Sequence, residues 1–90
     1  MSLALETLCA KVYLCLHNHT PTSGDVPNTA KVAATYITQI QERLDKGQAL
    51  TTFCHASLSR AANYAEEKGF YEFYKNIRNI LDDPHTRGYN

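Results

Sequence analysis

Thiol and imidazole side chains gather at two places in this sequence. Cys15, His17 and His19 form a Cys-x-His-x-His run, and Cys54 is followed directly by His55. Thiolate and neutral imidazole are both ligands that zinc prefers in proteins. A cysteine beside a histidine base is also the arrangement of a thiol nucleophile. These residue types therefore suit two kinds of chemistry: a zinc site, or catalysis by Cys54 with His17, His19 or His55 as the base.

The spacing of these residues favours neither chemistry. On a helix only Cys15 and His19 share a side, and neighbours such as Cys54 and His55 diverge by about 100°. The sequence contains no glycine-rich phosphate loop, nucleophile elbow or zinc-protease helix. We therefore expect a protein that is not an enzyme, with no catalytic residue, cofactor or metal ligand. A zinc-binding domain and a cysteine-dependent enzyme stay as less favoured alternatives, because sequence leaves open whether Cys15, His19, Cys54 and His55 converge.

Basic and aromatic residues near the C-terminus suggest a second kind of partner. A nucleic-acid-binding surface would combine cations with Tyr71 and Tyr74 for base stacking. The cations concerned are Arg60, Lys68, Lys75, Arg78 and Arg87. Acidic residues are interleaved with them, and nine basic and nine acidic residues give the chain zero formal charge. A small helical nucleic-acid-binding regulator is therefore the alternative function, and it is not favoured.

The elements that position these residues are predicted to be four helices. The hydrophobic periodicity predicts helices over residues 3–17, 29–46, 50–68 and 70–82. The fold class is therefore all-α, a small four-helix bundle or helical array with a C-terminal antiparallel helix hairpin. Residues 1–83 are expected to form a single helical domain and residues 84–90 a flexible C-terminal tail, which Pro84 separates from the last helix.

Each predicted helix has an apolar face that marks the expected core. The strongest belongs to the last helix, where six apolar residues fall within an arc of about 120°. Those residues are Phe70, Phe73, Tyr74, Ile77, Ile80 and Leu81. The other helices contribute Leu5, Leu8, Cys9, Val12, Cys15 and Leu16; Ala30, Ala33, Ile37, Ile40 and Leu44; and Leu50, Phe53, Cys54, Leu58, Ala61, Tyr64 and Ala65.

Glycine and proline mark the boundaries of these helices. Gly47 and Gly69 follow predicted helices directly and are expected to adopt the left-handed conformation that ends a helix. The run from Asn18 to Asn28 holds two prolines and a glycine and is predicted to be a surface loop. Its role is left open by the sequence.

The run NYAEEKGFYEFYKNIRNILDDP is similar in rhythm to a tetratricopeptide helix hairpin. Tyr64, Gly69, Tyr71 and Pro84 fall roughly where that repeat places its aromatic residues, glycine and proline. The interval from Gly69 to Pro84 is shorter than the repeat requires, and no second copy is present, whereas such arrays need about three repeats. The sequence is therefore assigned to no family.

The first predicted helix has apolar residues on two sides. Opposite its core face, Leu3, Ala10 and Leu14 line up between charged residues, so this helix is either central in the fold or shared with another protein. Tyr71 lies outside the core arc beside Tyr74 and Arg78, and tyrosine and arginine often anchor interfaces. The expected function is a non-enzymatic protein–protein interaction module, acting as a small adaptor, chaperone-like subunit or inhibitor by stoichiometric binding. The expected partner-binding residues are Leu3, Ala10, Leu14, Tyr71, Tyr74 and Arg78, with a homodimer through the first helix as one arrangement.

Composition indicates the compartment. The three cysteines are an odd number without a close pair, which suits small buried thiols in a reducing compartment better than a disulfide framework. No run approaches the roughly 18 apolar residues of a membrane span. We therefore expect a small soluble, cytoplasmic protein without a membrane partner.

Overall fold

The structure, a computed structural model, describes residues 4–18 and 26–83, which contain four α-helices. They are α1 (Leu5–Asn18), α2 (Val26–Asp45), α3 (Thr52–Glu67) and α4 (Tyr71–Asp82). The predicted all-α fold is confirmed. Among the helices described, none has the length and apolar composition needed to cross a membrane.

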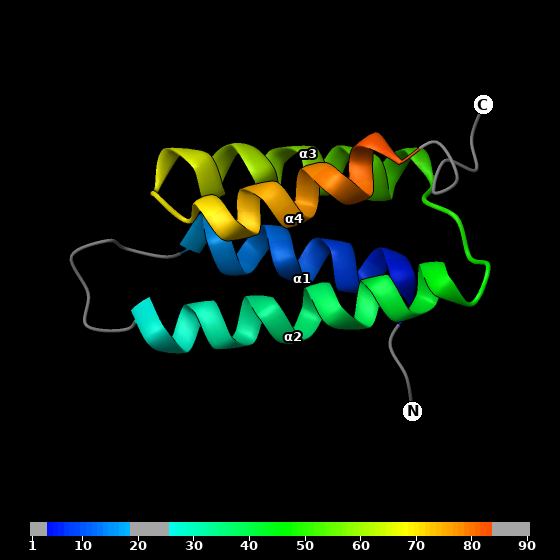
Figure 1. Cartoon of the computed structure of the whole chain (residues 1–90), viewed down its shortest axis with the longest axis horizontal. Helices are drawn as coiled ribbons and strands as arrows, with labels where there is room; N and C mark the ends of the chain where they lie inside the picture. The colour runs from blue at the N-terminus through cyan, green and yellow to red at the C-terminus, as the bar shows by residue number, and fades with distance from the viewer. Residues whose placement is uncertain (1–3, 19–25, 84–90) are drawn as a thin grey trace.

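The helices differ in how many neighbours they have. α1 packs extensively on both α2 and α3, and α3 packs extensively on both α1 and α4, whereas α2 and α4 contact each other only slightly. Figure 1 shows α1 lying between α2 and the α3/α4 pair, with α1 and α3 running in one direction and α2 and α4 in the other. The two central helices are therefore α1 and α3.

One hydrophobic cluster draws buried side chains from all four helices. The core face predicted for α1 is confirmed, since only Cys15 among its six residues is partly exposed. The predicted faces of α2 and α4 also point inward: Ala33, Ile37, Ile40, Ile77, Ile80 and Leu81 are buried. The aromatic residues of α4, Phe70, Phe73 and Tyr74, are partly buried and pack against this cluster.

Two glycines end helices as predicted. Gly47 has φ 96° and Gly69 has φ 86°, a conformation that costs glycine little. After Gly69, the Phe70 N–H donates to the Ala65 carbonyl (2.8 Å) and the Gly69 N–H donates to the Glu66 carbonyl (3.3 Å). This is the Schellman pattern, which satisfies the last carbonyls of α3 and reverses the chain into α4.

The start of α2 differs from its prediction. The helix begins at Val26, three residues before the predicted start, so Pro27 and Asn28 belong to its first turn and not to a loop. Proline is compatible with a first turn because the N–H that it lacks would have no partner inside the helix. At the other end of the predicted loop, Asn18 is the last residue of α1. Residues 19–25 lie outside the described residues, as do Leu3 and the predicted tail.

The start of α3 is set by a side chain. Thr51 is extended, and its hydroxyl oxygen accepts a hydrogen bond from the Cys54 N–H at 3.2 Å. This is an N-cap, which supplies an acceptor for one of the backbone N–H groups left over at a helix start. The helix therefore begins two residues later than predicted, and Leu50 is buried ahead of it.

Candidate functional site

A surface groove of about 390 Å³ lies between the two central helices. It is called the α1/α3 groove here, and its lining residues are Ala10, Tyr13 and Leu14 of α1 with Phe53, Ala56, Ser57 and Arg60 of α3. Arg60 is the only one of these residues that carries a charge. The groove is therefore apolar along most of its length, with a cation in its wall.

Two large hydrophobic side chains in this groove are open to solvent. Leu14 is 49% exposed and Phe53 is 53% exposed, and they project from different helices into the same groove. In the described part of the chain, the other large hydrophobic residues with comparable exposure are Val32 and Tyr71, which do not line it. The α1/α3 groove thus concentrates exposed apolar surface at one place.

Helical spacing explains why these residues meet. Ala10 and Leu14 are four residues apart on α1, and Phe53, Ser57 and Arg60 follow each other by four and three residues on α3. Residues so spaced share one side of a helix. Ala10, Ala56 and Ser57 have short side chains, which leave room between the two walls.

The prediction that Phe53 belongs to the core is wrong. Phe53 lies at one edge of the apolar arc predicted for α3, and Ala62 at the opposite side of that arc is 1% exposed. At 100° per residue, Ala62 lies about 40° beyond the predicted arc on the side away from Phe53, so the buried face of α3 is shifted toward Ala62. Rotation of the helix to this position turns Phe53 outward, toward Leu14 of α1.

Aromatic and polar residues occupy the neighbouring part of the same helix pair. Tyr13 and Arg60 also border a second hollow, which is completed by Asn63, Tyr64 and Glu67. The ring of His17 stacks on Tyr13 with a centroid distance of 5.7 Å and meets the edge of Tyr64 at 5.1 Å. Partial burial, reinforced by Tyr13 and Glu67, raises the pKa of the Tyr64 phenol above its ordinary value. This part of the surface therefore has a neutral phenol and a stacked imidazole.

Lys68 holds this end of the two helices together. Its Nζ donates to the carbonyl oxygens of Leu16 (2.6 Å) and His17 (2.9 Å), which belong to the last turn of α1. The same ammonium lies 5.4 Å from the centroid of the Tyr64 ring. A cation at the C-terminal end of a helix satisfies free carbonyls and the negative end of the dipole. Lys68, the residue directly after α3, therefore caps the C-terminal end of α1.

The structure brings together only some of the predicted partner-binding residues. Ala10 and Leu14 line the α1/α3 groove, and Leu3 lies outside the described residues. Tyr71 on α4 is 65% exposed, Tyr74 packs partly against the core, and Arg78 pairs with Asp82 at 2.7 Å. None of these three α4 residues lines the α1/α3 groove.

Sequence reasoning missed several residues of this groove. Tyr13, Phe53, Ala56 and Ser57 were not expected at a binding surface, and Arg60 was considered only for nucleic acid. Phe53 could have been suspected from its position at the edge of its apolar arc. That Phe53 and Leu14 would line the same groove could not be predicted from nearby sequence, because it depends on how α3 packs on α1.

The thiol and imidazole residues do not form one cluster in the described residues. Cys54 is buried and Cys15 is partly buried, while His19 lies outside the described part of the chain. Over residues 4–18 and 26–83, no group of three His, Cys, Asp or Glu side chains is placed to hold a metal ion. Burial, followed by the influence of Cys54, raises the pKa of the Cys9 thiol above its ordinary value.

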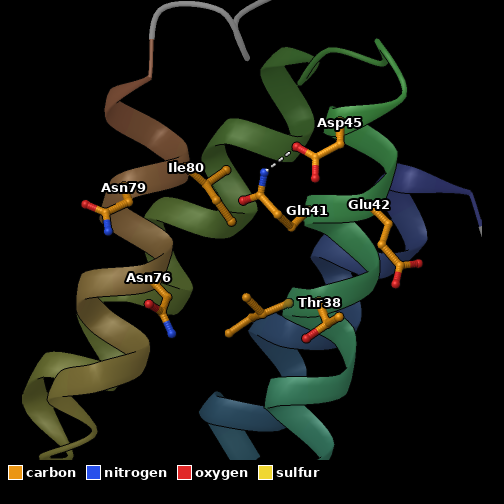
Figure 2. A pocket seen from close by; sticks show the side chains of 8 residues that line it. Thr38, Gln41, Glu42, Asp45, Asn76, Asn79 and Ile80 are labelled. Carbon is orange, nitrogen blue, oxygen red and sulfur yellow. Dashed lines mark hydrogen bonds between the residues drawn. The ribbon is translucent and has the colours of Figure 1, made fainter.

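A second groove, of about 430 Å³, follows the slight contact between α2 and α4. Its lining residues are mainly amides and carboxylates. Figure 2 shows Ile80 of α4 directed toward Gln41 of α2, whereas Asn79 points away from α2. The Gln41 amide donates to the Asp45 carboxylate at 3.0 Å, whereas Glu42 points away from α4. Its polar groups face solvent, so this groove presents less apolar surface to a partner than the α1/α3 groove.

Comparison with known proteins gives no match, whether to a family model, to a curated protein or to a solved structure. The geometry of the α1/α3 groove therefore carries the functional inference.

Proposed function

We propose that this protein is a non-enzymatic protein–protein interaction module that binds a helix of another protein in the α1/α3 groove. It would act by stoichiometric binding, as an adaptor, a chaperone-like subunit or an inhibitor. The observation that supports this most directly is the shared exposure of Leu14 and Phe53 in one groove. The three cysteines form no disulfide bond, which suits a cytoplasmic setting for this activity.

Exposed apolar side chains that gather in one place commonly mark a binding surface. Scattered single hydrophobic residues are normal on protein surfaces, but a contiguous patch flanked by polar residues is typical of an interaction site. Leu14 and Phe53 face the same groove from two helices, and Tyr13 and Arg60 lie beside them. Aromatic residues and arginine are the types that contribute most to binding energy at interfaces.

An amphipathic helix is the occupant that suits this shape. A groove between two packed helices accepts a third helix through apolar side chains spaced by three and four residues. Ala10, Ala56 and Ser57 let such a helix approach closely, while Leu14 and Phe53 provide apolar contact. Arg60 would pair with a carboxylate on the partner, since guanidinium and carboxylate form strong hydrogen bonds. The proposed ligand is thus an apolar helix that carries an acidic residue.

A second copy of this chain is one source of such a helix. The first helix supplies Ala10 and Leu14 to the groove, so two copies could pair through their α1 faces in a symmetric homodimer. This arrangement is distinguished from binding to a different protein by measuring the mass of the purified protein in solution.

Nucleic-acid binding receives less support. Of the basic residues considered for it, Lys68 donates to α1 carbonyls and Arg78 pairs with Asp82. Cations that already pair with groups of the same chain contribute less to phosphate binding than unpaired cations, and the formal net charge of the chain is zero.

The test compares groove variants with a matched surface control. Leu14→Glu and Phe53→Glu each place a charge in the groove, whereas Val32→Glu changes an exposed apolar residue of α2 that does not line it. The immobilised full chain and the three variants are incubated with an extract of cells that produce the protein, and bound proteins are quantified by mass spectrometry. We expect at least one protein to bind wild type and Val32→Glu equally and both groove variants at least about tenfold less.

Solution mass and helical content complete the test. Light scattering of wild type reports a dimer if the occupant is a second copy, and Leu14→Glu then gives a monomer. Circular dichroism should show unchanged helical content in all three variants, because the substituted side chains are exposed. A monomeric wild type with no protein lost selectively from the groove variants would contradict the proposal, and so would unfolding of Leu14→Glu.

A further inference from the structure

The outer side of α3 follows a seven-residue pattern. Five of its residues, in steps of four and three, line the hollows between α3 and α1: Phe53, Ser57, Arg60, Tyr64 and Glu67. This is the spacing by which one helix packs along another over several turns. Phe53, Arg60 and Glu67 are exposed, so none of the described helices covers this side of α3.

The side of α1 next to the groove has the same pattern. Ala10, Leu14 and His17 follow each other by four and three residues. Ala10 and Leu14 line the α1/α3 groove, and the His17 ring stacks on Tyr13 at its border. α1 and α3 run in the same direction (Figure 1), so the two patterned sides lie along each other. Together they provide two walls for a third helix.

The α1/α3 groove continues into a second hollow. This adjoining hollow, of about 310 Å³, shares Tyr13 and Arg60 with the groove and extends as far as Glu67. The distance along α3 from Phe53 to Glu67 is about 21 Å at 1.5 Å per residue. The combined surface therefore has room for a helix of about four turns.

The chemistry of this surface changes along its length. Phe53, with Leu14 across the groove, is apolar; Arg60 is basic and Glu67 is acidic, each seven residues after the one before on α3. Lys68, at the same end as Glu67, donates to carbonyl oxygens of α1. Opposite charges on facing helices attract and like charges repel, so this order discriminates among partner helices.

We propose that the α1/α3 groove and the adjoining hollow select a separate amphipathic helix whose side chains are apolar, acidic and basic in that order along the surface. This inference rests on the proposed function and adds the length and the charge order of the partner. The acidic side chain pairs with Arg60, and the basic one, about two turns away, pairs with Glu67. Arginine is the basic residue that fits best, because its guanidinium also packs on aromatic rings, and Tyr13 and Tyr64 border the same hollow.

Synthetic helical peptides are the probes that test this charge order. Each has about 18 residues, enough for four turns, and a hydrocarbon staple on one side that keeps it helical. On its other side, the matched peptide carries two leucines, then a glutamate and an arginine two turns farther along. The exchanged peptide has the glutamate and the arginine swapped. Both are also made in reversed residue order, so that either direction of the bound helix is covered. Fluorescence anisotropy with the full chain gives each Kd.

We expect wild type to bind the matched peptide, in one of the two directions, at least about fivefold more tightly than the exchanged one. The reason is that the swap replaces two attractions by two repulsions. The double variant Arg60→Glu/Glu67→Arg keeps the net charge and should prefer the exchanged peptide by a similar factor. The control variant Glu72→Lys/Lys75→Glu, an equivalent exchange at exposed positions of α4, should keep the wild-type preference. Added salt should reduce the preference in every case. Circular dichroism verifies that the variants are folded.

Three results would overturn this inference. Equal affinity of wild type for the matched and exchanged peptides would show that charge order is not recognised; if Leu14→Glu then loses both peptides, the proposed function stands. Failure of wild type to bind any of the peptides would also overturn it, whereas the proposed function is decided by capture from the cell extract. A wild-type dimer in light scattering that Leu14→Glu dissociates would make a second copy the occupant in place of a separate helix.

Discussion

The buried thiol of Cys9 ties the stability of the protein to pH. Burial is the main cause that raises its pKa in the folded protein, and Cys54 and Glu6 add to the effect. In the unfolded chain the thiol has its ordinary pKa of 9.0. Above that pH the unfolded state loses this proton while the folded state keeps it, so alkaline solution favours unfolding.

This gives a prediction at the scale of one residue. The free energy of unfolding should be unaffected by Cys9 ionisation below about pH 8 and should fall as pH rises above about 9, by up to about 1.4 kcal/mol per pH unit from this group. Cys9→Ala should remove that part of the slope. Urea unfolding under reducing conditions, at several pH values from about 7 to about 10, measures it.

The control in this measurement is to compare how the free energy of unfolding changes with pH in different variants. Other groups titrate in the same range, and burial also raises the pKa of Cys15, so wild type is compared with Cys9→Ala and with Cys15→Ala. Equal slopes for wild type and Cys9→Ala would show that the Cys9 thiol ionises in the folded protein as it does in the unfolded chain.

At the scale of elements, Lys68 couples the C-terminal ends of α1 and α3. Its two hydrogen bonds to the Leu16 and His17 carbonyls join residues more than fifty positions apart in sequence. Each bond has a charged donor, which makes it stronger than a bond between neutral groups. The positive charge of the Lys68 ammonium also offsets the partial negative charge at the C-terminal end of α1.

Lys68→Met should therefore destabilise the protein while keeping most of the aliphatic contact of the side chain. We expect a loss of about 1 to 2 kcal/mol, toward the low end for hydrogen bonds from a charged group because Lys68 is only partly buried. Lys75→Met, at an exposed position of α4, is the matched control and should change stability by less than about 0.5 kcal/mol. Urea unfolding of both variants provides the values. Equal stability of the two variants would mean that Lys68 contributes no more than an exposed lysine.

At the scale of the whole molecule, the packing is uneven. α1 and α3 each have two extensive helix contacts, whereas α2 and α4 each have one and meet each other only slightly. Regions with fewer buried contacts open more readily than the rest of a protein. The contact between α2 and α4, where the polar groove lies, is therefore the expected place of local opening (Figure 2).

Hydrogen exchange should reveal this difference. Amides in the middle of α1 and α3 should exchange more slowly than those in the middle of α2 and α4, by about tenfold or more. Mass spectrometry or NMR of the native protein measures these rates helix by helix. Equal protection of all four helices would show that the molecule opens only as one cooperative unit.

Local features of the fold could be predicted from the sequence alone. The number of helices, their approximate bounds and the inward face of α1 depend on periodicities within about twenty residues, and the structure confirms them. The glycine stops are equally local, because positive φ is a property of one residue. The early start of α2 shows the limit of such signals, since Pro27 suits a first helical turn as well as a loop.

The candidate site was decided by tertiary structure. Its residues come from two helices separated by more than thirty residues, and periodicity cannot specify how far one helix rotates against another. That rotation buries Ala62 and turns Phe53 out toward Leu14. The apolar pattern of a helix determines only that one face must be covered. Packing among all four helices determines which residues at the edge of that face stay exposed to water. Here one such residue is Phe53, which lines the α1/α3 groove.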